Sequence, residues 1–303
     1  MGAVFSDRRL RTDSARVGGK RIWTLWMQGV DSAPPLVRAC IDSWRKLNPT
    51  WTVVALDESN LADWVQLEDV IDLSRTDLTV QKKSALARLA LLRRHGGVWV
   101  DATVYCLQPL DAWLPDFHTT GFTVFRNPGP DRLASNWFIA AEPDNELLTA
   151  QYEAFVRFFN RRRFSNQDTA RGGMLLDLLG RHFNKDVRST RWWLNPIIQA
   201  MIKVYPYFVF HYIFNNLVLT DRRLAAVWNT APPLDARPPH RLQELAASED
   251  GIEQVFAMLE DPSLVLQKLD WRADLKSPYW SAVMGRLQEL MEERGKQVEA
   301  LSL

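Results

Sequence analysis

The sequence predicts an α/β protein in which a mostly parallel sheet is flanked by helices. Three segments predict it: apolar strands at residues 22–28 and 51–56, and between them a helix at residues 36–47 with apolar residues at helical spacing. A strand, a helix and a strand in this order form a parallel βαβ unit. Ligands of such sheets bind beyond the carboxyl ends of the strands, which lie near Gln28 and Asp57.

The following segments continue the alternation of helix and strand. Apolar residues at helical spacing, followed by Gly96, predict a helix over residues 81–95. Residues 98–105 alternate with period 2, which predicts a strand with Asp101 and Thr103 on one face. Two more strands are expected at residues 122–126 and 137–141, and a late one at residues 264–269.

Helical patterns predominate from about residue 145. We expect helices at residues 145–159, 172–183, 253–259 and 282–301, with a proline-rich loop at residues 232–239. The predicted organisation is a lead-in at residues 1–19 and one domain over residues 20–303, whose C-terminal portion is mainly helical.

Composition limits the classes of partner. The 37 basic and 36 acidic side chains leave a formal charge of +1, which provides no overall field for nucleic acid, so we expect no nucleic-acid partner. Cys40 and Cys106 are predicted to be buried thiols in a reducing compartment. Residues 1–19 lack the apolar core of a secretory signal, which favours a cytoplasmic location.

The most apolar stretch is residues 197–219, and it is interrupted by Lys203, Pro206 and His211. A bilayer-spanning helix needs about 20 residues with few polar breaks, so we expect buried helices here. A peripheral contact with the inner face of the membrane is the alternative. The basic run at residues 161–163 is either a solvated face or a site for anionic lipid.

One acidic residue interrupts the apolar strand after Gly96-Gly97. A lone carboxylate such as Asp101 is costly in a buried strand unless it is paired or binds a metal. With the Thr103 hydroxyl on the same face, it predicts a site for Mn²⁺ or Mg²⁺ that diphosphate oxygens and water would complete. Such a cation would stabilise the leaving group of a nucleotide-activated sugar. The alternative is an aspartate that accepts backbone hydrogen bonds at a strand end.

A basic residue accompanies this aspartate. Arg88 lies about two turns before Gly96 and is suited to donate to phosphate or sugar oxygens, the alternative being a solvated helix arginine. His211 is predicted to be a core histidine, and His240 lies in a loop that could approach a diphosphate. The five histidines form no i,i+4 pair, and no GxSxG, P-loop or GxGxxG motif is present, which disfavours other chemistries.

Several segments together resemble the bacterial capsular polysaccharide synthesis glycosyltransferases. They are IWTLWMQG, SALARLALL and RHGGVWVDATVYCLQPL within residues 20–110, and the later SNWFIA, YFVFHYIF and PPHRLQ. More distantly, the chain is similar to yeast initiating mannosyltransferases and clostridial glucosylating toxins. The resemblance implies a GT-A-like fold. It also implies a metal-dependent, retaining transfer of a hexose from a nucleotide-sugar donor to a saccharide or glycolipid acceptor.

The resemblance also implies roles for particular residues. It assigns Trp26 to stacking on the base, Asp101 to the metal and the donor, and Arg88 to the donor sugar or phosphate. Asn136 is expected in the donor pocket, where we also place Gln28 because the first strand ends there. Trp280 is expected either in a loop over the diphosphate or as a packing residue.

Two departures from the family pattern keep other functions open. Ala85 stands where relatives often have an aspartate that holds donor sugar hydroxyls, and Gln267 stands where they often have a histidine. These departures motivate an alternative, a non-catalytic nucleotide-sugar-binding subunit of a polysaccharide assembly complex. A metal-dependent hydrolase of nucleotide sugars is the third hypothesis.

Overall fold

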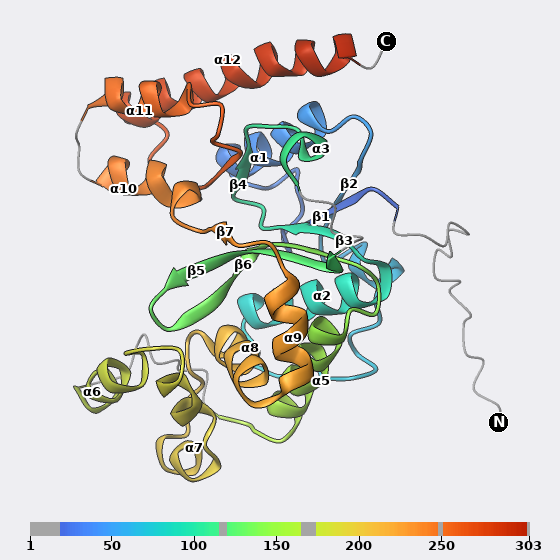
Figure 1. The fold of residues 1–303 in the computed structure, drawn as a ribbon, viewed down its shortest axis with the longest axis vertical. Helices are drawn as coiled ribbons and strands as arrows, with labels where there is room; N and C mark the ends of the chain where they lie inside the picture. The colour runs from blue at the N-terminus through green and yellow to red at the C-terminus, as the bar shows by residue number, and fades with distance from the viewer. Residues whose placement is uncertain (1–18, 115–119, 165–173, 248–250, 302–303) are drawn as a thin grey trace, which may run out of the picture.

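A computed structural model describes residues 19–114, 120–164, 174–247 and 251–301. Its centre is a six-stranded sheet with the strand order β2-β1-β3-β6-β5-β7 (Figure 1). These strands are β1 (Arg21–Leu25), β2 (Thr52–Leu56), β3 (Gly97–Val100), β5 (Phe122–Gly129), β6 (Arg132–Ala141) and β7 (Leu234–Asp235). Apart from Gly19, the predicted lead-in lies outside the described residues, and the division into a lead-in and one domain stays a prediction.

The strand pairings confirm the predicted α/β fold with a mostly parallel sheet. β1 is parallel to both β2 and β3, and β5 is parallel to β7, whereas β6 runs antiparallel to β3 and β5. A separate two-stranded antiparallel sheet joins β4 (Val104–Cys106) to β8 (Leu266–Lys268), which lies within the late strand expected from the sequence.

The prediction of one continuous strand over residues 98–105 is wrong. β3 ends at Val100, and the backbone N–H of Val104 donates a 2.9 Å hydrogen bond to the carbonyl of Asp101, which closes a turn. β4 then starts at Val104 and joins the other sheet. Asp101 and Thr103 therefore do not share a strand face. Period-2 alternation could not reveal this turn because it contains neither glycine nor proline.

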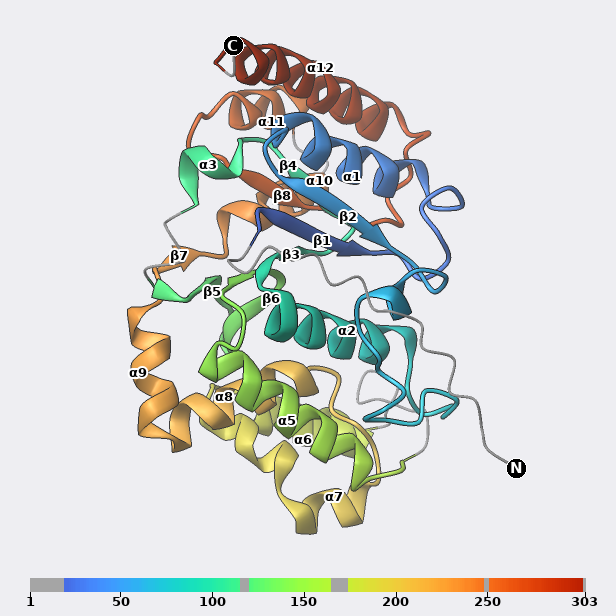
Figure 2. The same ribbon diagram turned by 90° about the vertical axis from the view of Figure 1, so that its right-hand side faces the viewer.

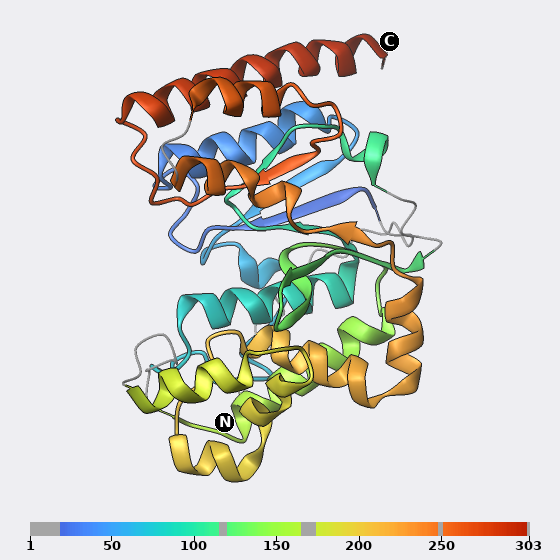
Figure 3. The same ribbon diagram turned by 60° about the vertical axis from the view of Figure 1, so that its left-hand side comes forward.

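Helices cover both faces of the central sheet (Figure 2). One layer contains α1 (Pro35–Leu47), α3 (Leu110–Trp113), α10 (Arg241–Ala247), α11 (Ile252–Leu259) and α12 (Pro278–Leu301). The other contains α2 (Val80–His95), α5 (Glu146–Asn160), α8 (Val209–Thr220) and α9 (Arg222–Thr230). α6 (Met174–Phe183) and α7 (Pro196–Ile202) lie at the end of the molecule opposite α12 (Figure 3). The described residues also form the short 3₁₀ helices η1 (Leu61–Asp63), η3 (Ser189–Leu194) and η4 (Pro238–His240).

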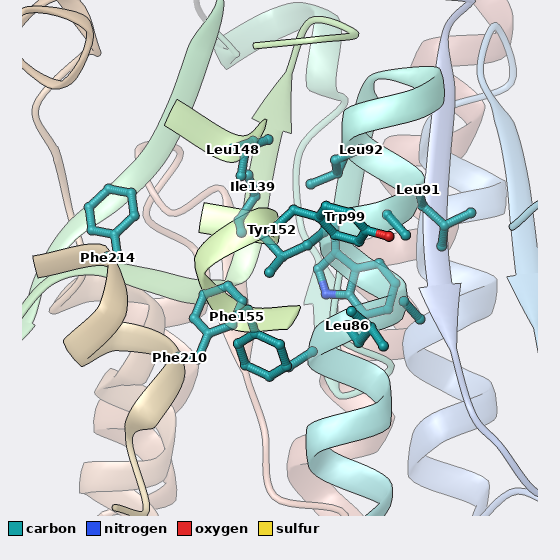
Figure 4. Packing of buried hydrophobic residues seen from close by; sticks show 14 of the residues in the cluster. Leu86, Leu91, Leu92, Trp99, Ile139, Leu148, Tyr152, Phe155, Phe210 and Phe214 are labelled. Carbon is teal, nitrogen blue, oxygen red and sulfur yellow. The ribbon is translucent and has the colours of Figure 1, made fainter. Parts of the chain in front are cut away.

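The largest apolar cluster packs α2, α5 and α8 against the sheet. Leu86, Trp99, Phe155 and Phe210 meet there (Figure 4). Cys40 and Cys106 are free and buried on the opposite side, as predicted. Within the described ranges, no helix combines the length and apolarity that crossing a bilayer requires.

The predicted helix before the glycine pair is α2, and its ends are defined locally. The Thr79 hydroxyl accepts from the backbone N–H of Lys82, and Gly96 caps the C-terminus with φ +64°. A Cβ at Gly96 would lie 2.6 Å from Pro143 Cδ, and one at Gly97 would lie 2.7 Å from the carbonyl oxygen of Arg21. Only glycine fits at these two positions, where the turn from α2 to β3 lies directly against Pro143 and the backbone of Arg21.

Candidate active site

Asp101 directly follows β3 and is held by two donors. Arg88 Nη2 donates to Asp101 Oδ1 at 2.8 Å, and Trp99 Nε1 donates to the same oxygen at 2.9 Å. The Asp101 side chain is 27% exposed, so the carboxylate is not turned into the apolar core. Asp101 Oδ2 accepts no hydrogen bond from any described residue. One carboxylate oxygen is thus held by two donors, and the other has no partner among the described residues.

Arg88 is buried, so the alternative of a solvated helix arginine is wrong. Its guanidinium carbon lies 4.8 Å from the centre of the Trp99 ring and 5.3 Å from that of Phe210. Burial lowers the pKa of Arg88 from its usual value, and the charge of Asp101 opposes this shift. Arg88 Nε and Nη1 are buried and donate to no described residue. Buried donors without a partner are rare in folded proteins, which sets Arg88 apart from an ordinary helix arginine.

Thr103 is paired with a residue far along the chain. Lys268 Nζ donates a short hydrogen bond to Thr103 Oγ1 and a 3.4 Å one to the carbonyl of Leu269. The pairing of β4 with β8 places Lys268 opposite Val104, beside Thr103. The expectation that Thr103 and Asp101 act together on a cation does not match this arrangement, because the Thr103 hydroxyl already contacts an ammonium group.

The donor set for a divalent cation is therefore small. The described part of the chain contains no group of three histidine, cysteine, aspartate or glutamate side chains that could hold a metal. Asp101 Oδ2 fits a cation that is held by one carboxylate together with substrate phosphates and water, which is the usual protein environment of Mg²⁺. Asp101 is the residue that would hold it.

His240 and Lys268 are brought together by Gln267. The buried Gln267 side chain donates to the carbonyl of Pro238 at 2.9 Å and accepts from the backbone N–H of Leu242 at 2.9 Å. It thereby ties β8 to η4. Burial is the largest cause of the lowered pKa of His240, and the charge of Lys268 adds to it. The departure at Gln267 thus has a structural role.

Trp26 and Asp101 lie at the ends of neighbouring strands. β1 and β3 are parallel neighbours, so both residues lie just beyond the carboxyl ends of adjacent strands. Trp26 also packs against the apolar cluster that contains Ala102. Its ring contacts Trp271 edge to face, with the ring centres 6.0 Å apart.

Trp271, and not Trp280, contacts Trp26. It is 43% exposed and lies three residues after Lys268. Trp280 instead starts α12, contacts Tyr279, and packs against the cluster of α11 and α12. No described contact joins Trp280 to Trp26 or Asp101. In the sequence, the only sign of this contact is that a tryptophan closes the segment LQKLDW at residues 266–271.

The remaining predicted residues surround this region less closely. Asn136 is half-buried on β6, next to Trp137, whose carbonyl accepts the Asp101 N–H at 2.8 Å. The Gln28 side chain is exposed. Ala85 is buried in the largest apolar cluster, so it offers no polar group where relatives often have aspartate.

Fold and site together define a class of protein. A mixed α/β sheet with charged and aromatic side chains beyond the carboxyl ends of parallel strands is typical of α/β proteins that bind small ligands. The family model described as "Capsular polysaccharide synthesis protein" matches residues 5–167, which is more than half of the chain. The chain belongs to this family, which confirms the resemblance inferred from the sequence.

Curated relatives match half of the chain. It is 28% identical over 170 residues to O-glycosyltransferase braB of Annulohypoxylon truncatum and 29% identical over 171 residues to glycosyltransferase afumC of Aspergillus fumigatus. Each match covers 50% of this chain, but only 40% and 44% of the two relatives. Among solved structures, the PaToxG glycosyltransferase aligns over 90% of this chain and 87% of its own, with 13% identity and a TM-score of 0.37.

Proposed function

We propose that this protein is a glycosyltransferase that moves a hexose from a nucleotide-sugar donor to a hydroxyl of a saccharide or glycolipid acceptor. The observation that carries the proposal is the buried, incompletely paired Arg88 beside Asp101 at the carboxyl end of β3. The family and the names of the two curated relatives support glycosyl transfer.

The donor would bind across the neighbouring strand ends. Trp26 and the exposed Trp271 offer aromatic surface for the base. The two free donors of Arg88 suit sugar or phosphate oxygens. Lys268 has no carboxylate partner among the described residues, so its ammonium is available to the diphosphate.

The chemistry is the displacement of a nucleoside diphosphate from the anomeric carbon. As the bond from this carbon to the diphosphate oxygen breaks, negative charge grows on the leaving group, and the ammonium of Lys268 would stabilise it. A divalent cation, Mn²⁺ or Mg²⁺, held by Asp101 would supply further neutralisation. In a retaining transfer the acceptor proton passes to the departing phosphate, so no separate base is required.

The test is Asp101→Asn, with Asp63→Asn on an exposed part of η1 as the matched control. UDP-, GDP- and CMP-sugars are first screened by thermal shift with and without Mn²⁺, because a ligand of the native state raises its melting temperature. With the donor so found, Asp101→Asn should abolish transfer and donor hydrolysis in a protein that stays folded but melts at a lower temperature, because buried Arg88 loses its carboxylate partner. Full turnover by a folded Asp101→Asn variant would reject the proposal.

A non-catalytic nucleotide-sugar-binding subunit is the second candidate. Buried Ala85 favours it, since it supplies no carboxylate for donor hydroxyls. Donor binding without transfer to any saccharide acceptor would support this candidate. Release of free sugar when no acceptor is present would instead indicate a hydrolase.

A further inference from the structure

Exposed apolar side chains are concentrated in one short part of the chain. Nine large hydrophobic side chains are strongly exposed among the described residues, and six of them lie within residues 174–207. These six are Met174, Leu178, Trp192, Ile197, Met201 and Tyr207. Single exposed apolar residues are ordinary, but such a concentration marks an interaction surface.

These residues belong to α6, η3, α7 and the segment that follows. Both α6 and α7 pack on η3, and together they form a terminal lobe at the end opposite α12 (Figures 1 and 3). Ile197 and Met201 are four residues apart on α7, so they lie on one face, with 72% and 78% exposure. Met174 and Leu178 have the same spacing on α6. Each helix thus presents an apolar face to solvent.

The same lobe is basic. Residues 174–208 contain two acidic side chains, Asp177 and Asp186, whereas the whole chain is nearly neutral. Against these stand five basic ones: Arg181, Lys185, Arg188, Arg191 and Lys203. All five basic side chains are exposed.

An arginine-lined cavity lies next to the lobe. Arg157, Arg161 and Arg162 line it together with Leu194, the last residue of η3, and its volume is about 150 Å³. No described carboxylate forms a salt bridge with these three arginines. The nearby charge of Arg161 adds to burial in lowering the pKa of Arg162. Unneutralised guanidinium groups beside apolar walls suit a phosphate group.

We propose that the lobe of residues 174–208 docks on an anionic membrane surface. Its apolar side chains enter the interface, and its basic side chains, with the arginine-lined cavity, meet lipid phosphates. Apolar faces bordered by arginine and lysine are the pattern of proteins that lie on anionic bilayers. A second copy of this chain is a poorer partner, because it would bring two basic lobes together.

The test is co-sedimentation of the full chain with vesicles of phosphatidylcholine alone or mixed with phosphatidylserine. We expect binding to the mixed vesicles and about a tenfold loss for the double variants Ile197→Ser/Met201→Ser and Arg188→Glu/Arg191→Glu. The matched controls are Leu219→Ser, an exposed apolar residue on the last turn of α8, and Lys296→Glu on the remote α12. Both controls should bind as wild type does.

Circular dichroism and thermal melting establish that each variant is folded, which is expected because all substituted side chains are exposed. The proposal is overturned if phosphatidylserine does not increase co-sedimentation of the wild-type protein, or if folded lobe variants bind the vesicles as tightly as the controls. It is also overturned if sedimentation velocity without vesicles shows self-association that Ile197→Ser/Met201→Ser abolishes. Vesicle binding requires no turnover, so these outcomes do not depend on the proposed glycosyl transfer.

Discussion

Arg88 and Asp101 form a 2.8 Å ion pair whose two members lie in different surroundings. The arginine side chain is 5% exposed and the aspartate side chain 27%. The apolar cluster of α2, α5 and α8 therefore holds the guanidinium of Arg88, which in turn orients the Asp101 carboxylate just beyond the carboxyl end of the central strand β3. Arg88, on the buried face of α2, thus holds a side chain that follows the carboxyl end of β3.

Replacement of Arg88 by methionine should reduce transfer more than it reduces stability. Methionine fills the site between Trp99 and Phe210, but Asp101 loses a charged donor, and we expect a cost of about 1–3 kcal/mol in the free energy of unfolding. Loss of the guanidinium should lower kcat/KM at least about a hundredfold, by analogy with removal of one preorganised donor. Steady-state kinetics and urea unfolding measure the two effects. Wild-type kcat/KM in the variant would exclude Arg88 from the site.

Substitution of Lys268 by methionine should weaken binding of the nucleoside diphosphate. A charge-assisted hydrogen bond contributes about 1.5–3 kcal/mol, so the dissociation constant should rise about tenfold or more. Calorimetric titration with the free nucleoside diphosphate measures this change. Lys276→Met, on an exposed position in the same loop region, is the control and should bind normally. If Lys268→Met and Lys276→Met bind the nucleoside diphosphate equally well, Lys268 only holds Thr103 by its hydrogen bond and does not contact the nucleotide.

Trp271→Ala and Trp280→Ala should affect different properties of the protein, nucleotide affinity in the first case and stability in the second. Stacking of an aromatic side chain on a base contributes about 1–3 kcal/mol by alanine substitution, so the exposed Trp271 should affect nucleotide affinity and hardly stability. Trp280 packs against the α11 and α12 cluster, so its loss should lower the melting temperature and leave affinity unchanged. Nucleotide titration and thermal melting of both variants decide the matter. The reverse result would restore Trp280 to the donor pocket.

His211 should make the protein sensitive to acid. Burial is the main cause that lowers the pKa of His211 from 6.5 to about 3, and its Nδ1 lies 2.9 Å from the carbonyl oxygen of Ala134. Below pH 6.5 the unfolded chain takes up a proton that the folded protein excludes, so stability falls as the pH decreases toward 3, by about 2 kcal/mol at pH 5. His211→Gln should flatten this part of the profile. Parallel pH profiles of urea midpoints for the two proteins would contradict the assignment.

The sequence alone was sufficient to predict the features that depend on residues close together along the chain. The βαβ unit at the start of the chain and the helix α2 with its Gly96 cap follow from local periodicity and turn residues. Asp101 was identifiable because a carboxylate in an apolar run needs a partner. The core histidine His211 followed from its apolar neighbours in the same way.

The tertiary structure decided which distant residues complete the site. Lys268 reaches Thr103 across 165 positions of sequence, and Gln267 brings η4 beside β8 through buried hydrogen bonds. Local patterns contain no information on such pairings, because they depend on how whole sheets and helices pack. The same holds for the contact of Trp271 with Trp26 and for the burial of Arg88, which lies against Trp99 of β3 and Phe210 of α8.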